Sequence, residues 1–352
     1  MEKVAVDLGY GFVKAISSSG KRVLFPSLVG KGYERALTDL FGQKNLTLSN
    51  MQVVYQGEDY FIGELAKESR SASRIFERER FTHVYTHVLL NAAIQAVTDK
   101  STKNVQLATG LPLDFYHAQA KEFQQSITGI QPKLEWKTGP FSHVSRAVHI
   151  EQALVFPQGA SAVFSALINH EGSFGYPHLM REGAVVALID VGFRTTDFVV
   201  VEMQSGGSFA PIARLSGTAD EGVINLHRDI RQAFKAQTGG ADINEFFIDR
   251  ILKDNELSYK GKRIDFANVI EKSKQSISAN IADRLKGVWA EESDLYEGIF
   301  LAGGGGDLFE SYLQPSFDHR LITINESQFA NAIGYLRLGK ALFSQQSTRN
   351  MM

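Results

Sequence analysis

Two segments far apart in the chain share one pattern, an apolar strand that ends in Asp-x-Gly. The pattern occurs at residues 4–9 (VAVDLG) and again at residues 187–192 (ALIDVG). A strand is a rigid mount, a carboxylate at its end can hold a hard cation through oxygen, and the glycine lets the backbone turn tightly against an anion. Two copies in one chain therefore predict two half-sites that face each other across a cleft.

The size and composition of the chain narrow the function classes. Its 352 residues exceed what one hydrophobic core usually serves, so we expect two domains. Apolar content of 43%, charged content of 22% and a formal net charge of −2 describe an ordinary globular protein without the electrostatic footprint of a nucleic-acid binder. We therefore expect no direct contact with nucleic acid.

The cysteine count and the apolar runs bear on location. The chain has no cysteine, which excludes a disulfide framework and thiolate metal sites and is compatible with a reducing compartment. The start of the chain lacks the pattern of a signal peptide, and no apolar run approaches the roughly 18 residues that span a bilayer. We expect a cytoplasmic protein that has no membrane partner.

The two halves are predicted to follow similar plans of strands and then helices. In the first half we expect strands at 4–6, 12–16, 22–25, 51–55, 60–62 and 105–112, with a helix at 83–97. A helix at 159–167 leads into the second half, where we expect strands at 185–189, 198–203, 212–215 and 298–302, and helices at 222–236, 266–289 and 326–342.

The first Asp-x-Gly hairpin combines Asp7, Gly9, Gly11 and Lys14. Its backbone amides can cradle a phosphate, and the lysine can neutralise the charge of that phosphate. The alternative is an ordinary tight turn with a lysine on the surface. Taken alone, the motif leaves both interpretations open.

The second hairpin carries Asp190 and Gly192, followed by the hydroxyls of Thr195 and Thr196. The hydroxyls could donate to a terminal phosphate. Asp190 together with Asp7 could hold the waters of Mg²⁺, which dehydrates reluctantly and binds nucleotide phosphates. The alternative here is a polar turn between two strands, which the pairing with the first motif disfavours.

A run of glycines follows the predicted strand at 298–302. Gly303, Gly304 and Gly305 would let backbone approach a flat ligand such as a purine, although a flexible loop is the alternative. The run is not the dinucleotide fingerprint, because its spacing differs and no β-α-β unit surrounds it, and the chain contains no Walker A motif. Separately, the charged run at 77–80 is interpreted as a solvated face, with a self-assembly contact as the alternative.

The ordered set of motifs resembles the superfamily of actin, sugar kinases and heat-shock chaperones. Within it, the chain is similar to the bacterial actin-like plasmid-segregation proteins, the ParM group. The resemblance covers residues 3 to 342 and is carried by both hairpins, the glycine run and the following further motifs: Pro157-Gln158, and residues 25–27, 60–66 and 109–112.

The resemblance implies an α/β fold of the actin-like type. Two duplicated ribonuclease-H-like domains would lie around a nucleotide cleft. Domain I would comprise residues 1–157 plus 330–352, and domain II residues 158–329.

The resemblance also implies roles for residues. Gln158 matches the residue that orients the attacking water, with Asp7 and Asp190 as the other catalytic positions, both holding Mg²⁺ through water. The positions that match nucleotide contacts are Gly9, Tyr10, Gly11, Lys14, Gly192, Thr195, Thr196, Glu221 for the ribose, Lys274 for the base, and Gly303, Gly304 and Gly305 for the adenosine.

Two departures from the family pattern stand in the hairpins. Tyr10 replaces a serine or threonine of many relatives, which puts a hydroxyl contact to the terminal phosphate in doubt. Phe193 and Arg194 replace two small residues, and Arg194 could reach either a phosphate or a neighbouring subunit.

The function implied is an ATPase whose hydrolysis of ATP, or of GTP, is coupled to polymerisation with Mg²⁺ as cofactor. The partners implied are further copies of the chain, in a homopolymeric filament, and a DNA-binding adaptor protein through which plasmid DNA is moved. The alternative is a small-molecule kinase of the same superfamily. The amide of Gln158 and the shortage of insertions that could build a substrate pocket argue against a kinase.

Overall fold

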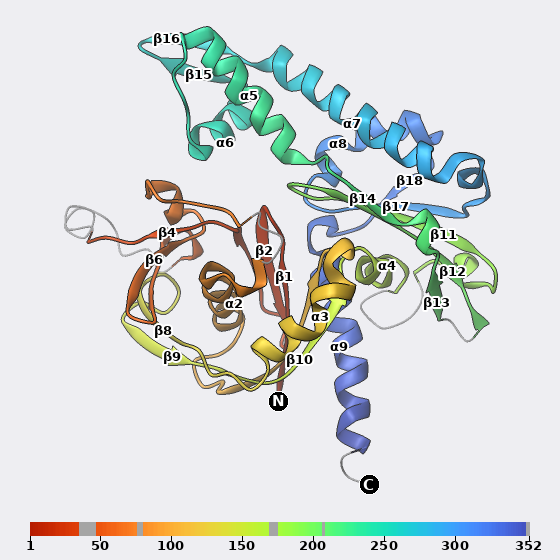
Figure 1. Cartoon of the computed structure of the whole chain (residues 1–352), viewed down its shortest axis with the longest axis horizontal. Helices are drawn as coiled ribbons and strands as arrows, with labels where there is room; N and C mark the ends of the chain where they lie inside the picture. Colours follow the sequence, from red (N-terminus) through yellow and green to blue (C-terminus); the bar gives the residue numbers. More distant parts are fainter. Residues whose placement is uncertain (35–46, 76–79, 169–174, 206–207, 350–352) are drawn as a thin grey trace. The chain divides into compact units, whose positions relative to one another are not determined.

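The structure is a computed structural model that describes residues 1–34, 47–75, 80–168, 175–205 and 208–349. The chain forms two compact units (Figure 1). Unit 1 contains residues 1–164 and 331–352, and unit 2 contains residues 165–330. The predicted boundary at 157/158 stays a prediction. Within the described ranges, no helix is long and apolar enough to cross a membrane.

Unit 1 is built on a mixed five-stranded sheet in the order β10-β7-β1-β2-β3. Strands β1 and β2 form an antiparallel hairpin that β3 continues, whereas β7 and β10 run parallel to β1. Apolar residues drive this arrangement, since Val4, Ala5, Val6 and Leu8 of β1 are buried. The strands are β1 (Glu2–Leu8), β2 (Phe12–Ser17), β3 (Arg22–Pro26), β7 (Asn104–Leu111) and β10 (His149–Pro157).

A second, antiparallel sheet in unit 1 has the order β4-β6-β5-β8-β9. The helix α2 (Val84–Ala96) joins this sheet to the first core through its buried Gln95. The Gln95 side chain accepts a hydrogen bond from Trp136 Nε1 at 2.8 Å and donates one to Arg146 O at 3.1 Å. The strands are β4 (Val29–Lys31), β5 (Met51–Tyr55), β6 (Glu58–Ile62), β8 (Lys133–Thr138) and β9 (Val144–Ala147), with the 3-10 turns η1 (Leu48–Asn50), η2 (Leu65–Glu68) and η3 (Arg80–Thr82).

Three further helices pack in unit 1 or at its ends. The amphipathic helix α3 (Leu113–Ile127) packs on β7 and β10. The helices α4 (Ala160–Leu167) and α9 (Ala330–Arg349) lie at the two passages of the chain between the units. Tyr335 of α9 lies so close to Gly110 of β7 that a Cβ on this glycine would collide with the tyrosine ring, so the last helix completes the core of unit 1.

Unit 2 repeats the hairpin-plus-parallel-strand plan, in the order β13-β12-β11-β17-β18 with β14 paired to β12. Strands β11 and β12 are antiparallel, and β17 and β18 run parallel to β11. The strands are β11 (Val185–Val191), β12 (Thr196–Met203), β13 (Phe209–Pro211), β14 (Gly217–Ala219), β17 (Gly298–Ala302) and β18 (Leu321–Thr323).

Helices pack against this sheet, and a small lobe extends from them. The lobe comprises α6 (Glu245–Asp254) and the two-stranded hairpin of β15 (Glu256–Tyr259) and β16 (Lys262–Asp265), at one end of α7 in Figure 1. The other helices and 3-10 turns are η4 (Pro177–Met180), η6 (Ala213–Leu215), α5 (Val223–Thr238), α7 (Ala267–Trp289), η7 (Ala290–Leu295), α8 (Gly306–Leu313), η8 (Gln314–Phe317) and η9 (Ser327–Phe329).

Most of the expected elements are confirmed, and three predictions need correction. The glycine run does lie in a β-α-β unit, because β17 and β18 are parallel and α8 lies between them in the sequence. Residues 212–215 are not a strand: Ala213–Leu215 form the 3-10 turn η6, and the strand beside β12 is Phe209–Pro211. Leu215 is buried there, and its carbonyl accepts from Trp289 Nε1 at 2.9 Å, a side-chain contact that replaces a ladder bond. The last helix begins at Ala330 rather than near 326, because Glu326 is left-handed (φ 60°). Residues 77–79 of the charged run lie outside the described residues.

Candidate functional site

In unit 1, Asp7 and Lys14 are cross-strand neighbours near the end of the β1–β2 hairpin. The antiparallel register pairs the two residues directly, and Lys14 Nζ lies 3.0 Å from Asp7 Oδ2. Asp7 is only 3% exposed, so this is a nearly buried ion pair rather than a surface one. A lysine at this position is therefore fixed by the hairpin, which is the geometry expected of a phosphate-neutralising group.

Gln158 reaches the same carboxylate from the passage between β10 and α4. Its Nε2 donates to Asp7 Oδ1 at 3.2 Å, and its side chain is buried. The backbone around it is anchored, since Gln158 N donates to Leu111 O at 2.8 Å and Gly159 N donates to Asn331 Oδ1 at 3.0 Å. The structure thus brings Gln158 together with Asp7 and Lys14, although the sequence predicted them from two separate motifs.

The partner of Gln158 decides which way its amide faces. A carboxylate only accepts hydrogen bonds, so the NH₂ group of Gln158 is turned toward Asp7 and the carbonyl oxygen Oε1 is turned away from it. This oxygen can accept a hydrogen bond from a water molecule. The arrangement is chemically suited to positioning water and cannot abstract a proton as a carboxylate would.

Side chains from other parts of unit 1 stabilise the turn that follows Asp7. Gly9 has no room for a side chain, because a Cβ there would lie 2.8 Å from Phe12 O and 3.0 Å from Lys14 Nζ. Ser27 Oγ donates to Gly9 O at 2.6 Å, and the Arg74 guanidinium donates to the carbonyls of Tyr10 and Gly11. These donors neutralise the carbonyl dipoles of the turn, which leaves the turn more attractive to an anion.

In unit 2, Asp190 occupies the corresponding place at the end of β11. It is 8% exposed and is paired in register with Asp197 of β12. The turn closes through Gly192 N, which donates to Thr195 O at 2.9 Å. The hydroxyl of the fully buried Thr196 donates to Glu221 O at 2.9 Å. Within this unit, the Thr196 hydroxyl therefore secures the start of the next element, and Thr195, which is partly exposed, is the better placed of the two for a ligand.

The two large residues of this second turn have partners within unit 2. Phe193 packs edge-on against His227 of α5, with ring centroids 5.2 Å apart. Arg194 Nε lies 3.9 Å from Asp220 Oδ1. The first amides of α5 donate to the carbonyls of Gly192 and Phe193, so the helix start clamps the turn.

The glycine run lies against Asp190 and the residue after it. A Cβ on Gly303, whose φ is +89°, would collide with Asp190 Oδ1 and Val191 O. Gly305 N donates to Val191 O at 2.8 Å, and a Cβ at Gly305 would lie 2.8 Å from Val191 Cγ1. Gly304 differs, since a Cβ there would touch only the Gln328 side chain at 3.4 Å. The chain's own packing thus explains Gly303 and Gly305 but not Gly304.

Glu221 has one satisfied and one unsatisfied oxygen. Asn280 Nδ2 of α7 donates to Glu221 Oε1 at 3.2 Å, whereas Glu221 Oε2 is a buried atom with no hydrogen-bond partner among the described residues. A buried carboxylate oxygen without a donor is costly, and a ligand hydroxyl would satisfy it. Lys274 lies on the same helix, α7, and is partly buried.

The predicted metal ligands belong to different units. Asp7 is in unit 1 and Asp190 in unit 2, and the described residues contain no group of three or more metal-ligating side chains. Both oxygens of Asp7 already have donors within unit 1. Because both carboxylate oxygens of Asp7 already accept hydrogen bonds, a cation bound through water fits Asp7 better than a directly coordinated one. Cation binding by these two aspartates stays a prediction.

Comparison with known proteins places the chain among proteins of this architecture. Residues 5–160 match the family model for the N-terminal domain of actin-like proteins, and residues 188–315 match that for the C-terminal part of the archaeal actin homologue, MreB-like. An archaeal actin homolog of Thermoplasma acidophilum is 23% identical over 347 residues, covering 95% of this chain and 98% of that protein. This chain belongs to the actin-like family.

Solved structures extend the comparison of this actin-like protein. A 15-stranded ParM filament from Clostridium botulinum is 28% identical, with a TM-score of 0.85 over 97% of this chain and 100% of that chain. An archaeal actin homolog in complex with ADP has a TM-score of 0.78 at 19% identity, over 97% of this chain and 100% of that one, which shows the shared fold. The prediction of an actin-like fold is confirmed.

The sequence did not predict three residues of this actin-like protein that hydrogen-bond to the residues of the site and position them. Arg74 binds the first turn, Asn331 holds the backbone beside Gln158, and Asn280 orients Glu221. None of them belongs to a short motif. Each is far from its partner in sequence, so only the folded chain reveals it.

Proposed function

We propose that this actin-like protein is a filament-forming ATPase of the ParM group that binds ATP, or GTP, with Mg²⁺. The observation that carries the proposal is the constellation in unit 1, where Asp7 is bonded to Lys14 at 3.0 Å and to Gln158 at 3.2 Å. A cation, a carboxylate and a water-positioning amide are the parts that phosphoryl transfer to water requires.

A nucleotide fits the residues that are present. The orphaned Oε2 of Glu221 would accept a hydroxyl of the ribose, and Lys274 would lie toward the base. Gly304 has space that the chain does not fill, which supports its assignment to the adenosine together with Gly303 and Gly305. The order of these motifs in the sequence supports the proposal that the loops of both units bind one nucleotide.

The chain's residues would divide the work at the phosphates. Lys14 and the amides of Gly9, Tyr10 and Gly11 would bind phosphate from unit 1, and Gly192 and Thr195 from unit 2. Thr196 would support that loop, because its buried hydroxyl donates to Glu221 O. Asp7 and Asp190 would hold the waters of Mg²⁺, which supplies charge neutralisation when bound. Gln158 Oε1 would accept a hydrogen bond from the attacking water and so orient it.

The proposed partner is a second copy of the chain. The similarity to a ParM filament supports self-assembly, and repeated head-to-tail contacts give open filaments. Loss of the terminal phosphate would remove the contact to Thr195 and so weaken the polymer. We further infer a cytoplasmic role in plasmid segregation through a DNA-binding adaptor, which agrees with the net charge of −2 and with the ParM similarity.

The kinase alternative is not favoured by these comparisons, because the chain matches actin-like families across both units. Light scattering with ATP and Mg²⁺, run alongside phosphate release, tests the proposal. We expect scatter to rise above a critical protein concentration and to fall as phosphate accumulates. Flat scatter together with turnover stimulated by a sugar would reverse the preference in favour of a kinase.

A further inference from the structure

The glycine that follows Gln158 is held by a residue from the last helix of unit 1. Gly159 has a φ of +74°, in the left-handed region, and its amide donates to Asn331 Oδ1 at 3.0 Å. The hydrogen bond is buried, and Asn331 is 8% exposed. Glycine backbone has access to more conformations than that of other residues, so this hydrogen bond selects the conformation of the turn. The direction in which the Gln158 side chain leaves the turn therefore depends on Asn331.

The start of α9 lies directly on the start of α4. A Cβ on Gly334 would collide with the carbonyl of Ser161, so the two helix backbones are in contact there. Ser161 Oγ donates in turn to Pro157 O at 3.0 Å, at the residue that precedes Gln158. A displacement of the first turn of α9 would therefore also displace the turn between β10 and α4.

In unit 2, the 3-10 turn η9 holds the glycine run. Gly303 N donates to Ser327 O at 3.1 Å. The side chain of Gln328 borders the space at Gly304, since a Cβ on this glycine would lie 3.4 Å from Gln328 Nε2. The proposed function assigns this space to the adenosine. A purine bound there would therefore contact η9 as well as the glycine run.

Continuous helical backbone joins η9 to Asn331. The turn ends at Phe329, and α9 begins at the next residue, Ala330, whose dihedral angles are helical (φ −51°, ψ −47°) and whose amide donates to Ser327 O. Ser327 and Ala330 are both buried. The chain passes from unit 2 to unit 1 within residues 327–331. Coupling between distant sites is carried by hydrogen bonds, packed side chains and rigid elements of this kind.

We infer that Asn331 is a positioning residue for Gln158 and that it makes the rate of hydrolysis depend on the base bound in unit 2. A purine that contacts Gln328 and the glycine run fixes η9. With η9 fixed, Asn331 holds the turn in which Gln158 reaches Asp7. The inference rests on the proposed function in taking Gln158 as the residue that orients water.

Asn331→Ala should slow hydrolysis without weakening nucleotide binding. We expect single-turnover phosphate release from saturating ATP, below the critical concentration for filaments, to slow about tenfold, because a small misplacement of a reacting group is costly, while Kd is unchanged. Asn331→Asp keeps an oxygen that can accept from Gly159 N, and an acid is tolerated in the first turn of α9, so this variant should regain most of the rate. A wild-type rate in Asn331→Ala, or equal losses of rate and affinity, would overturn the inference.

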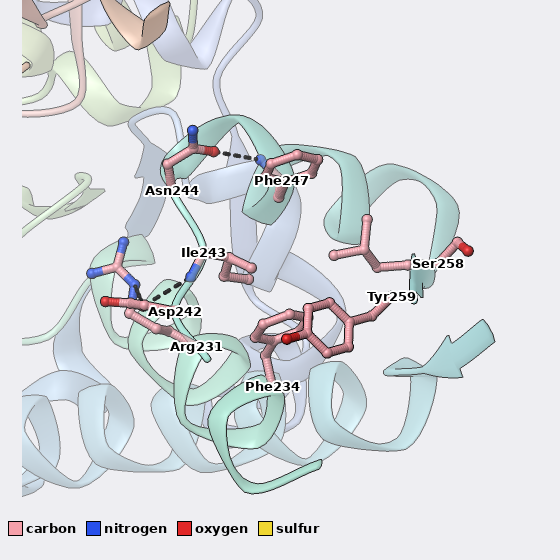
Figure 2. Close-up of a pocket in the computed structure, with 9 residues that line it drawn as sticks. Arg231, Phe234, Asp242, Ile243, Asn244, Phe247, Ser258 and Tyr259 are labelled. Atoms are coloured by element: carbon pink, nitrogen blue, oxygen red, sulfur yellow. Dashed lines mark hydrogen bonds and ion pairs between the residues drawn. The ribbon is translucent and has the colours of Figure 1, made fainter. Parts of the chain in front are cut away.

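Two variants control for a loss of stability alone. Arg337→Ala removes another hydrogen bond between α9 and α4, since Arg337 Nη1 donates to Phe164 O at 3.3 Å, farther along both helices from Gln158. Asn244→Ala removes the same kind of bond as Asn331→Ala in the small lobe, where Figure 2 shows Asn244 accepting from Phe247 N at 3.3 Å. Both controls should unfold at a lower denaturant concentration and still release phosphate at the wild-type rate. Release slowed in both controls as much as in Asn331→Ala would contradict a positioning role.

Inorganic triphosphate, which has no base, tests the link to unit 2 in the wild-type chain. At saturation we expect ATP to be cleaved about tenfold faster than triphosphate in the wild type, again because of the placement of Gln158, and the two to be cleaved at similar rates in Asn331→Ala. Equal rates for both substrates in the wild type would overturn the link to the base.

Hydrogen exchange gives a readout that needs no turnover. Peptides that cover residues 157–164 should exchange more slowly when ADP binds to the wild-type chain, and Asn331→Ala should abolish this response, because Gly159 N loses its acceptor. Exchange that is unaffected by ADP in the wild type would overturn the inference. A chain that keeps the response to ADP but hydrolyses no ATP would count against the proposed function alone.

Discussion

Gln158 donates its side-chain amide to Asp7 at 3.2 Å, although 151 positions of sequence separate them. The bond fixes the orientation of the amide and leaves Gln158 Oε1 as an acceptor. The hydrogen bond connects Gln158, which follows β10, to Asp7 near the end of β1. Asp7 also forms an ion pair with Lys14, so its carboxylate lies at the centre of the site in unit 1.

Removing the amide should separate binding from hydrolysis. We expect Gln158→Ala to lower the rate of phosphate release about 100-fold, the order of loss that misplacing a reacting group causes, while nucleotide affinity changes little. Single-turnover phosphate release and nucleotide titration measure the two quantities. Gln131→Ala, a change in an exposed glutamine of unit 1, is the control. Equal losses in affinity and rate would assign Gln158 to binding instead.

Asp190→Ala is expected to abolish hydrolysis and to stabilise any filaments that still form. The reason is that the variant loses the carboxylate proposed to bind the waters of Mg²⁺ in unit 2, while the pairing of β11 with β12 remains. Phosphate release and pelleting measure the effect, with Asp220→Ala as a matched control because the side chain of Asp220 is 83% exposed. Phosphate release at the wild-type rate from Asp190→Ala would remove this residue from the site.

Glu221 offers a test of nucleotide binding. Glu221→Gln should weaken nucleotide affinity about tenfold, since a hydrogen bond to a charged group contributes about 1.5 kcal/mol or more. Asn280→Ala should cause a smaller loss, because it only frees the carboxylate that Asn280 orients at 3.2 Å. Titration with a fluorescent nucleotide measures both. An unchanged affinity in Glu221→Gln would leave the orphaned oxygen without a ligand role.

The glycine run should respond unevenly to alanine. Gly303→Ala is expected to lower the free energy of unfolding by about 2 kcal/mol, because φ is +89° there and the new Cβ would meet Asp190 and Val191. Gly304→Ala should leave stability unchanged and reduce nucleotide affinity. Chemical denaturation and nucleotide titration distinguish the two effects. Similar losses of stability in both variants would mean that Gly304 is required for packing and not for nucleotide binding.

Stability at alkaline pH should depend on Tyr296. Burial is the main cause that raises the pKa of its hydroxyl to about 12, and Glu292 adds to the rise. An unfolded tyrosine ionises near 10, so the folded chain keeps the proton that the unfolded chain releases, and the free energy of unfolding should fall as pH rises from about 10 to 12. Tyr296→Phe should reduce this slope in denaturant titrations. An identical slope in the variant would assign the effect to other groups.

The local elements could be predicted because their signals are local. The hairpins at Asp7 and Asp190 each combine an apolar run with a glycine turn, and the spacing of apolar residues predicts α2, α5 and α7. The turn at Leu215 could not be predicted, since the bond from Trp289, 74 positions away, selects it over a strand. The same holds for the supports of the site, because Arg74, Asn331 and Asn280 act over long sequence distances.

The partition of unit 1 into two stretches of chain has a consequence for synthesis. Residues 165–330 are all synthesised before the helix α9 that packs against β7 is complete. Unit 2 can thus complete its core while the sheet of unit 1 still lacks α9, since domains fold as units once all of their residues are present. The unit whose synthesis begins first is therefore the last to receive all of its residues.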